Sequence, residues 1–284
     1  MATEKVSTIK SSGGHYTTLT AWEADLGSAG GVTGADLVTN DEIAVAELYN
    51  DLSDKAFTNG WTTDSTRYVH IRPASGLGHG GSTSSGILIT PSAASSGPLL
   101  IYITAKVSDL RFTDTLDIGT DGFIRHASLL GAGEELTIER CIFQPTNGNR
   151  LALNVKTGTS TGVKLINCLI YGMTRGVSAL STSDAEILNC TIVDCGDRGH
   201  LRTVVKNTFF YGHTASDYFS PSTGSTNYAS SDTTGSAGLQ SLTSAEFNNY
   251  AGGDYSLAAT SNLIGAGVDL SGTFTDDIAG NTRS

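Results

Sequence analysis

The sequence predicts an all-β solenoid, a fold in which short strands stack as successive turns of one coil. A turn-rich composition and a recurring motif in the middle of the chain predict it. Gly supplies 34 of the 284 residues and only 16% of the residues are charged, so turn formers are abundant and strong helix formers are scarce. Hydrophobic residues make up 38% of the chain and occur in clusters, which favours a packed core over disorder.

Four segments share one motif: alternating apolar and polar residues, a polar corner, a small residue and an apolar pair. They are Leu136–Phe143, Val163–Ile170, Ala185–Ile192 and Thr203–Phe210. The small residues are Cys141, Cys168, Cys190 and Thr208, which lie 27, 22 and 18 residues apart. A step near twenty residues with insertions of variable length is typical of one turn of a solenoid.

Each position of the motif has a physical reason. Alternate strand residues point to opposite faces, so Leu136 and Ile138 are expected inside the coil and Thr137 outside. The corner position holds Arg140, Asn167, Asn189 and Asn207. Asn adopts a left-handed backbone more readily than most residues, and stacked Asn side chains form hydrogen-bonded ladders. The small residue after the corner is expected to turn inward.

Three of these segments resemble the coils of right-handed parallel β-helix proteins, the architecture of pectate lyases and many phage tailspikes. They are Asn167-Cys-Leu-Ile-Tyr-Gly172, Asn189-Cys-Thr-Ile-Val-Asp194 and Asn207-Thr-Phe-Phe-Tyr-Gly212. The tail Asp254–Gly267 resembles the segment that closes many such proteins. The resemblance covers residues 65 to 270 and implies a single-stranded right-handed parallel β-helix, while it implies nothing about chemistry.

The N-terminal segment is expected to contain a polar leader, a helix and a strand. The helix is predicted within Thr17–Leu26, with Thr17 or Thr18 as its N-cap. Asp41–Tyr49 is predicted as a strand because Ile43 and Val45 alternate with Glu42 and Ala44, and a short helix is the alternative. A helix across the open end of a solenoid covers its apolar interior, so we expect an N-terminal capping helix.

Five other stretches between the N-terminal segment and the motif fit further coils. They are Tyr68–Ile71, Gly86–Thr90, Leu99–Ile103, Leu110–Phe112 and Gly122–Arg125. The predicted organisation is a cap or attachment segment over residues 1–62, the parallel β-helix over 63–214 and a loop-rich closing segment over 215–284. Residues 215–245 are rich in Ser, Thr, Gly, Asn and Asp and are expected to form an extended loop.

The charge balance and the apolar pattern exclude several classes of protein. The 17 Lys and Arg residues against 28 Asp and Glu give a net charge of −11, which argues against a nucleic-acid binder because phosphate contacts need clustered cations. No apolar run approaches the ~18 residues of a membrane span, and the first residues hold no apolar signal core. We therefore expect synthesis in a cytoplasm and no membrane insertion.

The four cysteines match no zinc-site spacing and are expected to be free, buried thiols. Three of them belong to the motif, whereas Cys195 lies outside it, so that a more exposed position is the alternative for this residue. Aromatic residues that could line a sugar-binding groove are Trp61, Tyr68, Tyr171, Phe209, Phe210 and Tyr211. Among these, we expect Phe209 in the core, and Tyr171 and Tyr211 in lateral contacts between coils.

Val193–His200 is the best candidate for glycan chemistry. It offers Asp194, Asp197 and His200 within seven positions, and hydrolysis of a glycosidic bond uses two carboxyl groups. The segment loosely resembles the paired Asp and Gly-His-Gly elements of polygalacturonases. The Asn-Thr-Asp element, the adjacent Asp pair and the Arg-Ile-Lys element of those enzymes are missing here, so a solvated turn between coils is the favoured interpretation.

Other polar residues have simple structural explanations. Asp114, Asp117 and Asp121 carry oxygen ligands that suit Ca²⁺, but their spacing is not that of an EF-hand loop, and turn formation is favoured. His70 and His126 lie on predicted strands, where an outward or hydrogen-bonded position is expected. No catalytic, cofactor-binding or metal-binding residue is assigned.

We therefore predict a non-enzymatic structural protein of a phage virion, such as a head-decoration, fibre or tail-associated component. The segment Met1–Gly60 resembles the starts of β-helix proteins encoded in phage structural gene clusters, which implies attachment through this region. Expected partners are other virion proteins of the capsid or tail, and host-surface glycans and a homotrimer remain open. The alternative is a carbohydrate-binding or polysaccharide-degrading β-helix protein that uses Asp194, Asp197 and His200.

Overall fold

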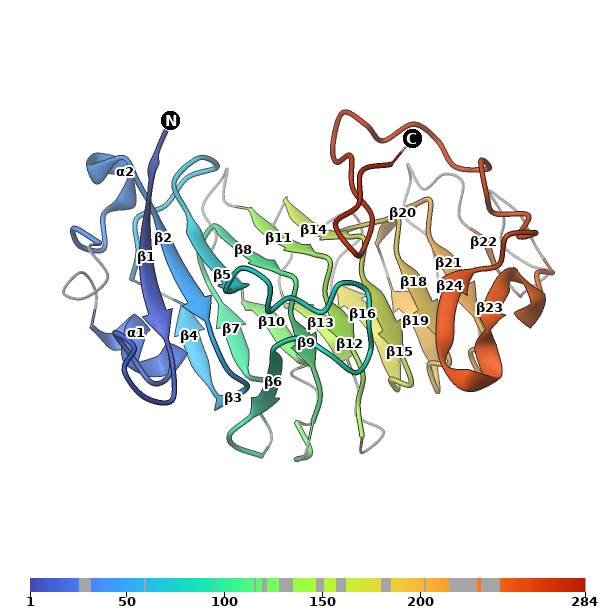
Figure 1. The fold of residues 1–284 in the computed structure, drawn as a ribbon, viewed down its shortest axis with the longest axis horizontal. Coiled ribbons are helices and arrows are strands. Elements are labelled where there is room, and N and C mark those ends of the chain that lie inside the picture. Colours follow the sequence, from blue (N-terminus) through green and yellow to red (C-terminus); the bar gives the residue numbers. More distant parts are fainter. Residues whose placement is uncertain are drawn as a thin grey trace.

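A computed structural model places most strands of the chain in three long parallel sheets (Figure 1). The structure describes residues 1–25, 32–58, 60–94, 96–114, 116–118, 122–127, 135–146, 151–156, 162–179, 185–201, 203–214, 229–230 and 241–283.

The chain visits these three sheets in turn. The first sheet contains β1 (Thr3–Ile9), β2 (Glu42–Leu48), β5 (Val69–Pro73), β8 (Ala105–Ser108), β11 (Leu136–Glu139), β14 (Val163–Ile166), β17 (Ala185–Leu188) and β20 (Val204–Lys206). The second contains β3 (Leu52–Asp54), β6 (Leu88–Pro91), β9 (Arg111–Phe112), β12 (Ile142–Phe143), β15 (Leu169–Tyr171), β18 (Thr191–Val193), β21 (Phe209–Tyr211) and β22 (Ala229–Ser230). The third contains β4 (Ala56–Thr58), β7 (Leu99–Ile101), β10 (Ile124–Ala127), β13 (Leu151–Lys156), β16 (Arg175–Ala179) and β19 (Arg198–Leu201).

From β2 to β19, each turn of the chain adds one parallel strand to each sheet. This arrangement is the all-β solenoid that the repeats predict. The four motif segments form β11 with β12, β14 with β15, β17 with β18, and β20 with β21. The four motif segments therefore supply strands to the first and second sheets. The five further predicted strands are present as β5, β6, β7, β9 and β10.

The core runs along the inside of the coil without a break. Neighbouring strands are in register, so Ile138 faces Leu165, Leu165 faces Ile187, and Ile187 faces Val205. All four side chains are buried, and burial of each such residue stabilises the fold by roughly 1.5–3 kcal/mol. On the second sheet the rings of Phe112 and Phe143 stack with centroids 4.9 Å apart. Stacking of like residues from turn to turn explains why the coil needs several turns.

The predicted N-terminal helix is present as α1 (Leu19–Ala24). The Thr18 side chain accepts a hydrogen bond from the Ala21 N–H, so Thr18 is the N-cap. Leu19 and Trp22 are buried, and the rings of Trp22 and Trp61 lie 5.6 Å apart. A second, four-residue helix, α2 (Leu37–Asn40), precedes β2.

The strand predicted at residues 41–49 is present as β2, but the residues that enter the core are Ala44, Ala46 and Leu48. Val45 points to the other face, where it lies between Val6 and His70 in the register of the first sheet. The expected polar leader forms the seven-residue strand β1, which pairs with β2. Strands β1 to β4, all within residues 1–62, thus belong to the same three sheets as the later strands.

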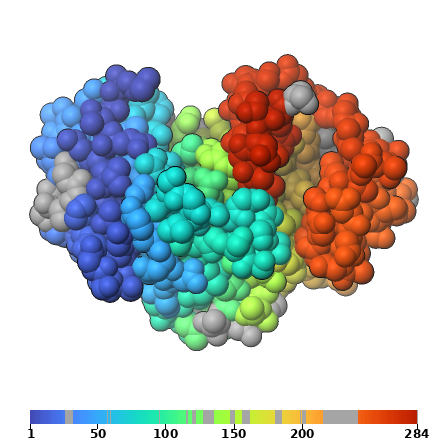
Figure 2. Space-filling model, viewed as in Figure 1, coloured from blue at the N-terminus to red at the C-terminus, as the bar shows by residue number. Residues whose placement is uncertain are grey.

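After position 240, the described chain folds over the outside of the coil. The 3-10 turns η1 (Ser244–Glu246) and η2 (Tyr250–Gly252) flank β23 (Phe247–Asn249), which pairs with β24 (Asp254–Leu257) as an antiparallel hairpin. We call residues 258–283 the C-terminal strap. Figure 2 shows the strap in red against the teal residues that follow β5, and the hairpin in orange. Most of the loop predicted at 215–245 (215–228 and 231–240) lies outside the described residues.

Candidate functional site

A column of left-handed corners joins the first sheet to the second. The backbone φ angle is 47° at Arg140, 54° at Asn167, 56° at Asn189 and 48° at Asn207, and Asp109 continues the column at 60°. The Asn189 amide donates a hydrogen bond to Oδ1 of Asn167. The predicted corner and its asparagine ladder are therefore confirmed. We call these five positions the corner column.

The small residues after the corner stack inside the coil, as predicted. The Cys141 N–H donates to Sγ of Cys168 at 3.5 Å, and the Cys168 N–H donates to Sγ of Cys190 at 3.4 Å. Thr208 takes the next place, where its Oγ1 accepts from the Cys190 N–H at 3.3 Å. All four cysteines of the chain are buried and without disulfides. Burial raises the pKa of the Cys141 and Cys190 thiols, so they are poor nucleophiles at neutral pH.

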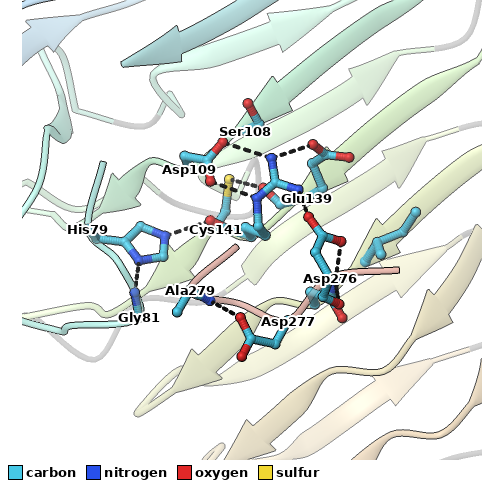
Figure 3. Close-up of polar contacts among 12 residues, drawn as sticks. His79, Gly81, Ser108, Asp109, Glu139, Cys141, Asp276, Asp277 and Ala279 are labelled. Atoms are coloured by element: carbon cyan, nitrogen blue, oxygen red, sulfur yellow. Dashed lines mark hydrogen bonds and ion pairs between the residues drawn. The ribbon is translucent and has the colours of Figure 1, made fainter. Parts of the chain in front are cut away.

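Arg140 is the centre of a charge cluster at the corner column. Figure 3 labels its partners Asp109, Glu139 and Asp276. Its guanidinium binds Asp109 through two hydrogen bonds of 2.7 and 3.0 Å, contacts Glu139 at 2.7 Å and forms an ion pair with Asp276 of the strap. Burial alone raises the pKa of Asp109, but the hydrogen bonds from Arg140 outweigh it and the net pKa is lowered. The cluster therefore gathers three acidic side chains around the Arg140 guanidinium and ties the strap to the coil.

His79 ties the loop between β5 and β6 to the same corner. Its Nε2 lies 2.6 Å from the Arg140 carbonyl oxygen, and its Nδ1 accepts the Gly81 N–H at 2.9 Å. The side chain is 2% exposed. Burial lowers the pKa of His79, and the hydrogen bond to Arg140 opposes this effect only in part. His79 is therefore a neutral, positioned imidazole at neutral pH.

The C-terminal strap is bound along the corner column by side-chain amides. Asn207 accepts from the Val268 N–H and donates to the Val268 carbonyl, each at 2.8 Å. Asn167 donates to the Asp276 carbonyl at 2.9 Å. The Arg283 guanidinium donates to Oδ1 of Asn189 at 3.0 Å and to Oδ1 of Asn167 at 3.2 Å. The ladder thus serves both the coil and the strap.

An aromatic cluster fixes the hairpin to the outer face of the second sheet. Phe209 stacks on Phe247 with centroids 4.9 Å apart, and Tyr211 meets Tyr250 edge-on at 5.0 Å. Tyr171 and Tyr255 lie 5.1 Å apart in the same cluster. The C-terminal part is therefore attached at two places, the aromatic cluster and the corner column.

A groove of about 1340 Å³ lies between these two attachments. Its floor consists of two rows of the coil: Asn167, Asn189 and Asn207, and Leu169, Thr191 and Phe209. Its walls come from hairpin residues 252–257, from the strap and from Gly81, Ser82 and Thr83 of the β5–β6 loop. Figure 2 shows the hollow between the red strap and the orange hairpin.

The groove combines uncharged polar groups with aromatic faces. The amide and hydroxyl groups of its floor lie beside Phe209, and Tyr255 and Phe274 contribute rings to the walls. Ionised groups at its lining are Asp254, Asp269, Asp277 and Arg283. Rings, hydroxyls and amides of this kind suit a polar chain such as a glycan, while Asn167 and Asn207 also bind the strap and Phe209 also stacks on Phe247.

The residues of the alternative enzymatic hypothesis are bound to separate structural partners. Asp194, at a left-handed corner with a φ of 53°, accepts a hydrogen bond from the Tyr250 hydroxyl. Burial raises the pKa of Asp194, and the Tyr250 hydrogen bond opposes that effect. Asp197 accepts a hydrogen bond of 2.6 Å from Nε of Arg175. The backbone of His200 lies in β19 opposite Val177, but its side chain lies outside the description.

The proposed calcium ligands are only partly described, because Asp121 lies outside the described residues. Asp114 is buried, and its Oδ1 accepts the Thr146 N–H at 2.6 Å. Asp117 is exposed. Within the described residues, no three His, Cys, Asp or Glu side chains are grouped so as to hold a metal ion.

Among the expectations for single residues, those for Cys195 and His70 are confirmed and those for Phe209 and His126 are wrong. Cys195 is fully buried like the other three cysteines, and its N–H donates to Nδ1 of His213 at 2.9 Å. Phe210, not Phe209, enters the core of the coil. His70 is hydrogen-bonded, with Nε2 3.0 Å from Oγ of Ser108. His126 is not outward: it is 0% exposed, and neither ring nitrogen has a hydrogen-bond partner among the described residues.

Tyr171 and Tyr211 pack against the C-terminal hairpin rather than only between coils. The sequence interpretation missed the cluster of His79, Arg140 and Asp276. The available sequence signal was Arg140 itself, the one cation at a motif position that otherwise holds asparagine. Its partners Asp109 and Asp276 lie 31 and 136 residues away in the chain, so no local pattern connects them.

In the part of the chain that the structure describes, no helix has the length and apolar character to cross a membrane. Comparisons of this chain with family models, with curated proteins and with solved structures find no match.

Proposed function

We propose that this chain is a non-enzymatic structural protein of a phage virion, a head-decoration, fibre or tail-associated component. The observation that carries the proposal is the continuous, in-register core, which stacks like residues through every turn. A core of this kind makes a stiff body in which each turn supports the next. Such a body suits a part that must hold a fixed position on a particle.

We further propose that the solenoid is a right-handed β-helix and that α1 is its N-terminal cap. Crossovers between parallel strands of one sheet are right-handed in about 98% of cases. The buried carboxylate of Asp54, in β3, accepts hydrogen bonds from the Leu19 and Thr20 N–H groups of α1 at 2.6 and 3.2 Å. These bonds and the Trp22–Trp61 contact place α1 beside the first strands of the second and third sheets.

Attachment through the N-terminal region is supported by the position of β1 at the end of the first sheet. The Thr3 N–H and the Ile9 carbonyl form hydrogen bonds on the β2 side of the strand. Because successive strand residues point their peptide groups to opposite sides, those of Glu4 and Val6 point away from β2. An edge of this kind pairs with an extended segment of another protein. The proposed partners are other virion proteins, and the proposed place of synthesis is the host cytoplasm. Repeated copies on the particle, or a homotrimer, would add avidity to a modest interface.

The test is analysis of purified virus particles from the source that carries this sequence. Mass spectrometry and cryo-electron microscopy are expected to find the chain at symmetric positions, with residues 1–60 at the contact. A Val6→Pro variant, which removes an outward N–H and keeps the bonds to β2, is expected to lower incorporation, whereas Val6→Thr incorporates normally. Particles without the chain would contradict the proposal.

A second candidate function is carbohydrate binding, favoured by the groove lined with amides, hydroxyls and aromatic rings. A glycan array followed by calorimetry on each bound oligosaccharide tests it. Thr191→Arg places a charged side chain on the floor of the groove and is expected to weaken binding at least about tenfold. Thr137→Arg, on the outer face of the first sheet, is the matched control and should bind normally. Cleavage of the glycan is not part of this candidate, because Asp194 and Asp197 are bound to Tyr250 and Arg175.

A further inference from the structure

The β5–β6 loop, residues 74–86, is fastened to the coil at its centre. His79 contacts the Arg140 carbonyl of the corner column, and Gly81 lies against Ala279 of the strap. The end of the same loop packs on the His79 backbone, because a Cβ at Gly86 would lie only 2.5 Å from Cα of His79. The next residues, Gly81, Ser82 and Thr83, form a wall of the groove. His79 therefore joins this wall of the groove to the corner column, beside the contact of Gly81 with the strap.

The two hydrogen bonds of His79 define its protonation state. Nδ1 accepts from the Gly81 N–H, so it carries no proton, and Nε2 faces a carbonyl oxygen, so it carries one. An imidazolium has a proton on both nitrogens. Protonation would point the Nδ1–H at the Gly81 N–H, so this bond is lost and two donors are left facing each other.

We propose that His79 is an acid-released latch: its protonation frees the β5–β6 loop and opens the groove beside the C-terminal strap. The latch is independent of the proposed virion role, because it depends only on the contacts of this loop. It makes access to the groove depend on pH.

The charged and titratable groups around the imidazole come from several elements. They are Asp109 at the corner after β8, Arg111 in β9, Glu139 and Arg140 at the end of β11, Cys168 at the corner after β14, and Asp276 and Asp277 in the strap. Asp109 stays ionised in mild acid, since its pKa is lowered. Its ion pair with Arg140 is therefore kept at a pH at which the loop is released.

The direction of the effect follows from linkage. In the closed loop the pKa of His79 is lowered, chiefly by burial, whereas in a released loop it returns to about 6.5. The released loop thus binds more protons, so acid favours release. Between these two pKa values, the ratio of released to closed loop rises about tenfold per pH unit. Above pH 7 the latch stays closed.

Hydrogen–deuterium exchange of the full chain at pH 7.5 and pH 5.0, corrected for the intrinsic exchange rate, tests the latch. Exchange of residues 76–86 is expected to rise about tenfold at pH 5.0, while amides of β14 and β17 stay protected. His79→Gln keeps a donor and an acceptor without a charge and is expected to abolish the rise. His79→Arg carries a permanent charge and is expected to release the loop at pH 7.5.

An equal rise in His79→Gln, or no rise in the native chain, would overturn the proposal. The His126→Leu background removes a second buried imidazole, which lies outside this loop, and should leave the rise intact. If the His79 variants do not fold, ¹⁵N NMR of the native chain decides. Loss of the Gly81 amide contact must then coincide with protonation of His79, and a contact that survives protonation contradicts the latch.

Discussion

Asn207 binds both main-chain polar groups of Val268: its Oδ1 accepts the Val268 N–H and its Nδ2 donates to the Val268 carbonyl, each at 2.8 Å. One side chain at a left-handed corner of the coil thereby fixes the path of the C-terminal strap 61 residues later. The same residue type that shapes the turn also recognises the segment that covers it. Backbone geometry and strap binding can be separated by mutation.

Asn207→Gly is expected to loosen the strap and leave the coil intact. Glycine adopts the left-handed corner without strain, so the change removes only the two side-chain hydrogen bonds. Each is worth roughly 0.5–1.5 kcal/mol, and hydrogen exchange in residues 262–271 should rise accordingly. Amides of β20 should keep their protection. Unchanged exchange in residues 262–271 would show that Asn207 does not hold this part of the strap.

The cysteine column predicts thiols that react only after unfolding. All four cysteines are buried, so a thiol reagent such as DTNB should label none in the native protein and four in guanidinium. Cys168→Ser is expected to be tolerated because Oγ can accept the Cys141 N–H in place of Sγ. Cys168→Leu adds bulk to a packed interior and should cost about 1–3 kcal/mol of the free energy of unfolding. Rapid labelling of native protein would contradict the inward orientation of the column.

The sequence was sufficient for the repeating part of the fold, since the spacing of Cys141, Cys168 and Cys190 carried the register of the turns. The sequence did not reveal β13 or β16. The insertions that make the spacing of the motif vary lie near the strands of the third sheet, so no regular pattern is left there. β1 was missed because its alternation is weak and its partner β2 is far along the chain. The corner column was predicted, but its binding of the strap was not: Asp276 and Val268 approach it only through the tertiary fold.

His126 predicts a loss of stability in acid. It points into the core between Ile101 and Val155, and burial lowers its pKa to about 4. The unfolded chain takes up this proton near pH 6.5, so the free energy of unfolding falls as the pH drops from 6.5 towards 4, by on the order of 3 kcal/mol. Above pH 6.5 the imidazole is neutral in both states and this dependence vanishes.

His126→Leu is expected to remove that acid-dependent step and to raise stability at pH 7, because two buried nitrogens without hydrogen bonds are replaced by an apolar group. His126→Gln is the matched control, since it removes the titration but keeps a buried polar group. Denaturant melts at pH 7.5, 6.0 and 5.0 measure both effects. An acid slope in His126→Leu equal to that of the native chain would assign the slope to other groups such as His70, whose pKa burial lowers to about 3.

Gly176 and Gly196 form a matched pair that tests how closely the turns of the third sheet approach each other. A Cβ at Gly176 would lie 2.2 Å from the Gly199 carbonyl oxygen, whereas a Cβ at Gly196 would meet nothing nearer than 3.9 Å. Backbone cannot yield as a flexible side chain does, so Gly176→Ala must displace β19 from β16. We expect a loss of about 1–3 kcal/mol in the free energy of unfolding, typical of an overpacked interior, and little change for Gly196→Ala. Equal stability of the two variants in guanidinium melts would mean that β16 and β19 are not held at the distance that the in-register coil requires.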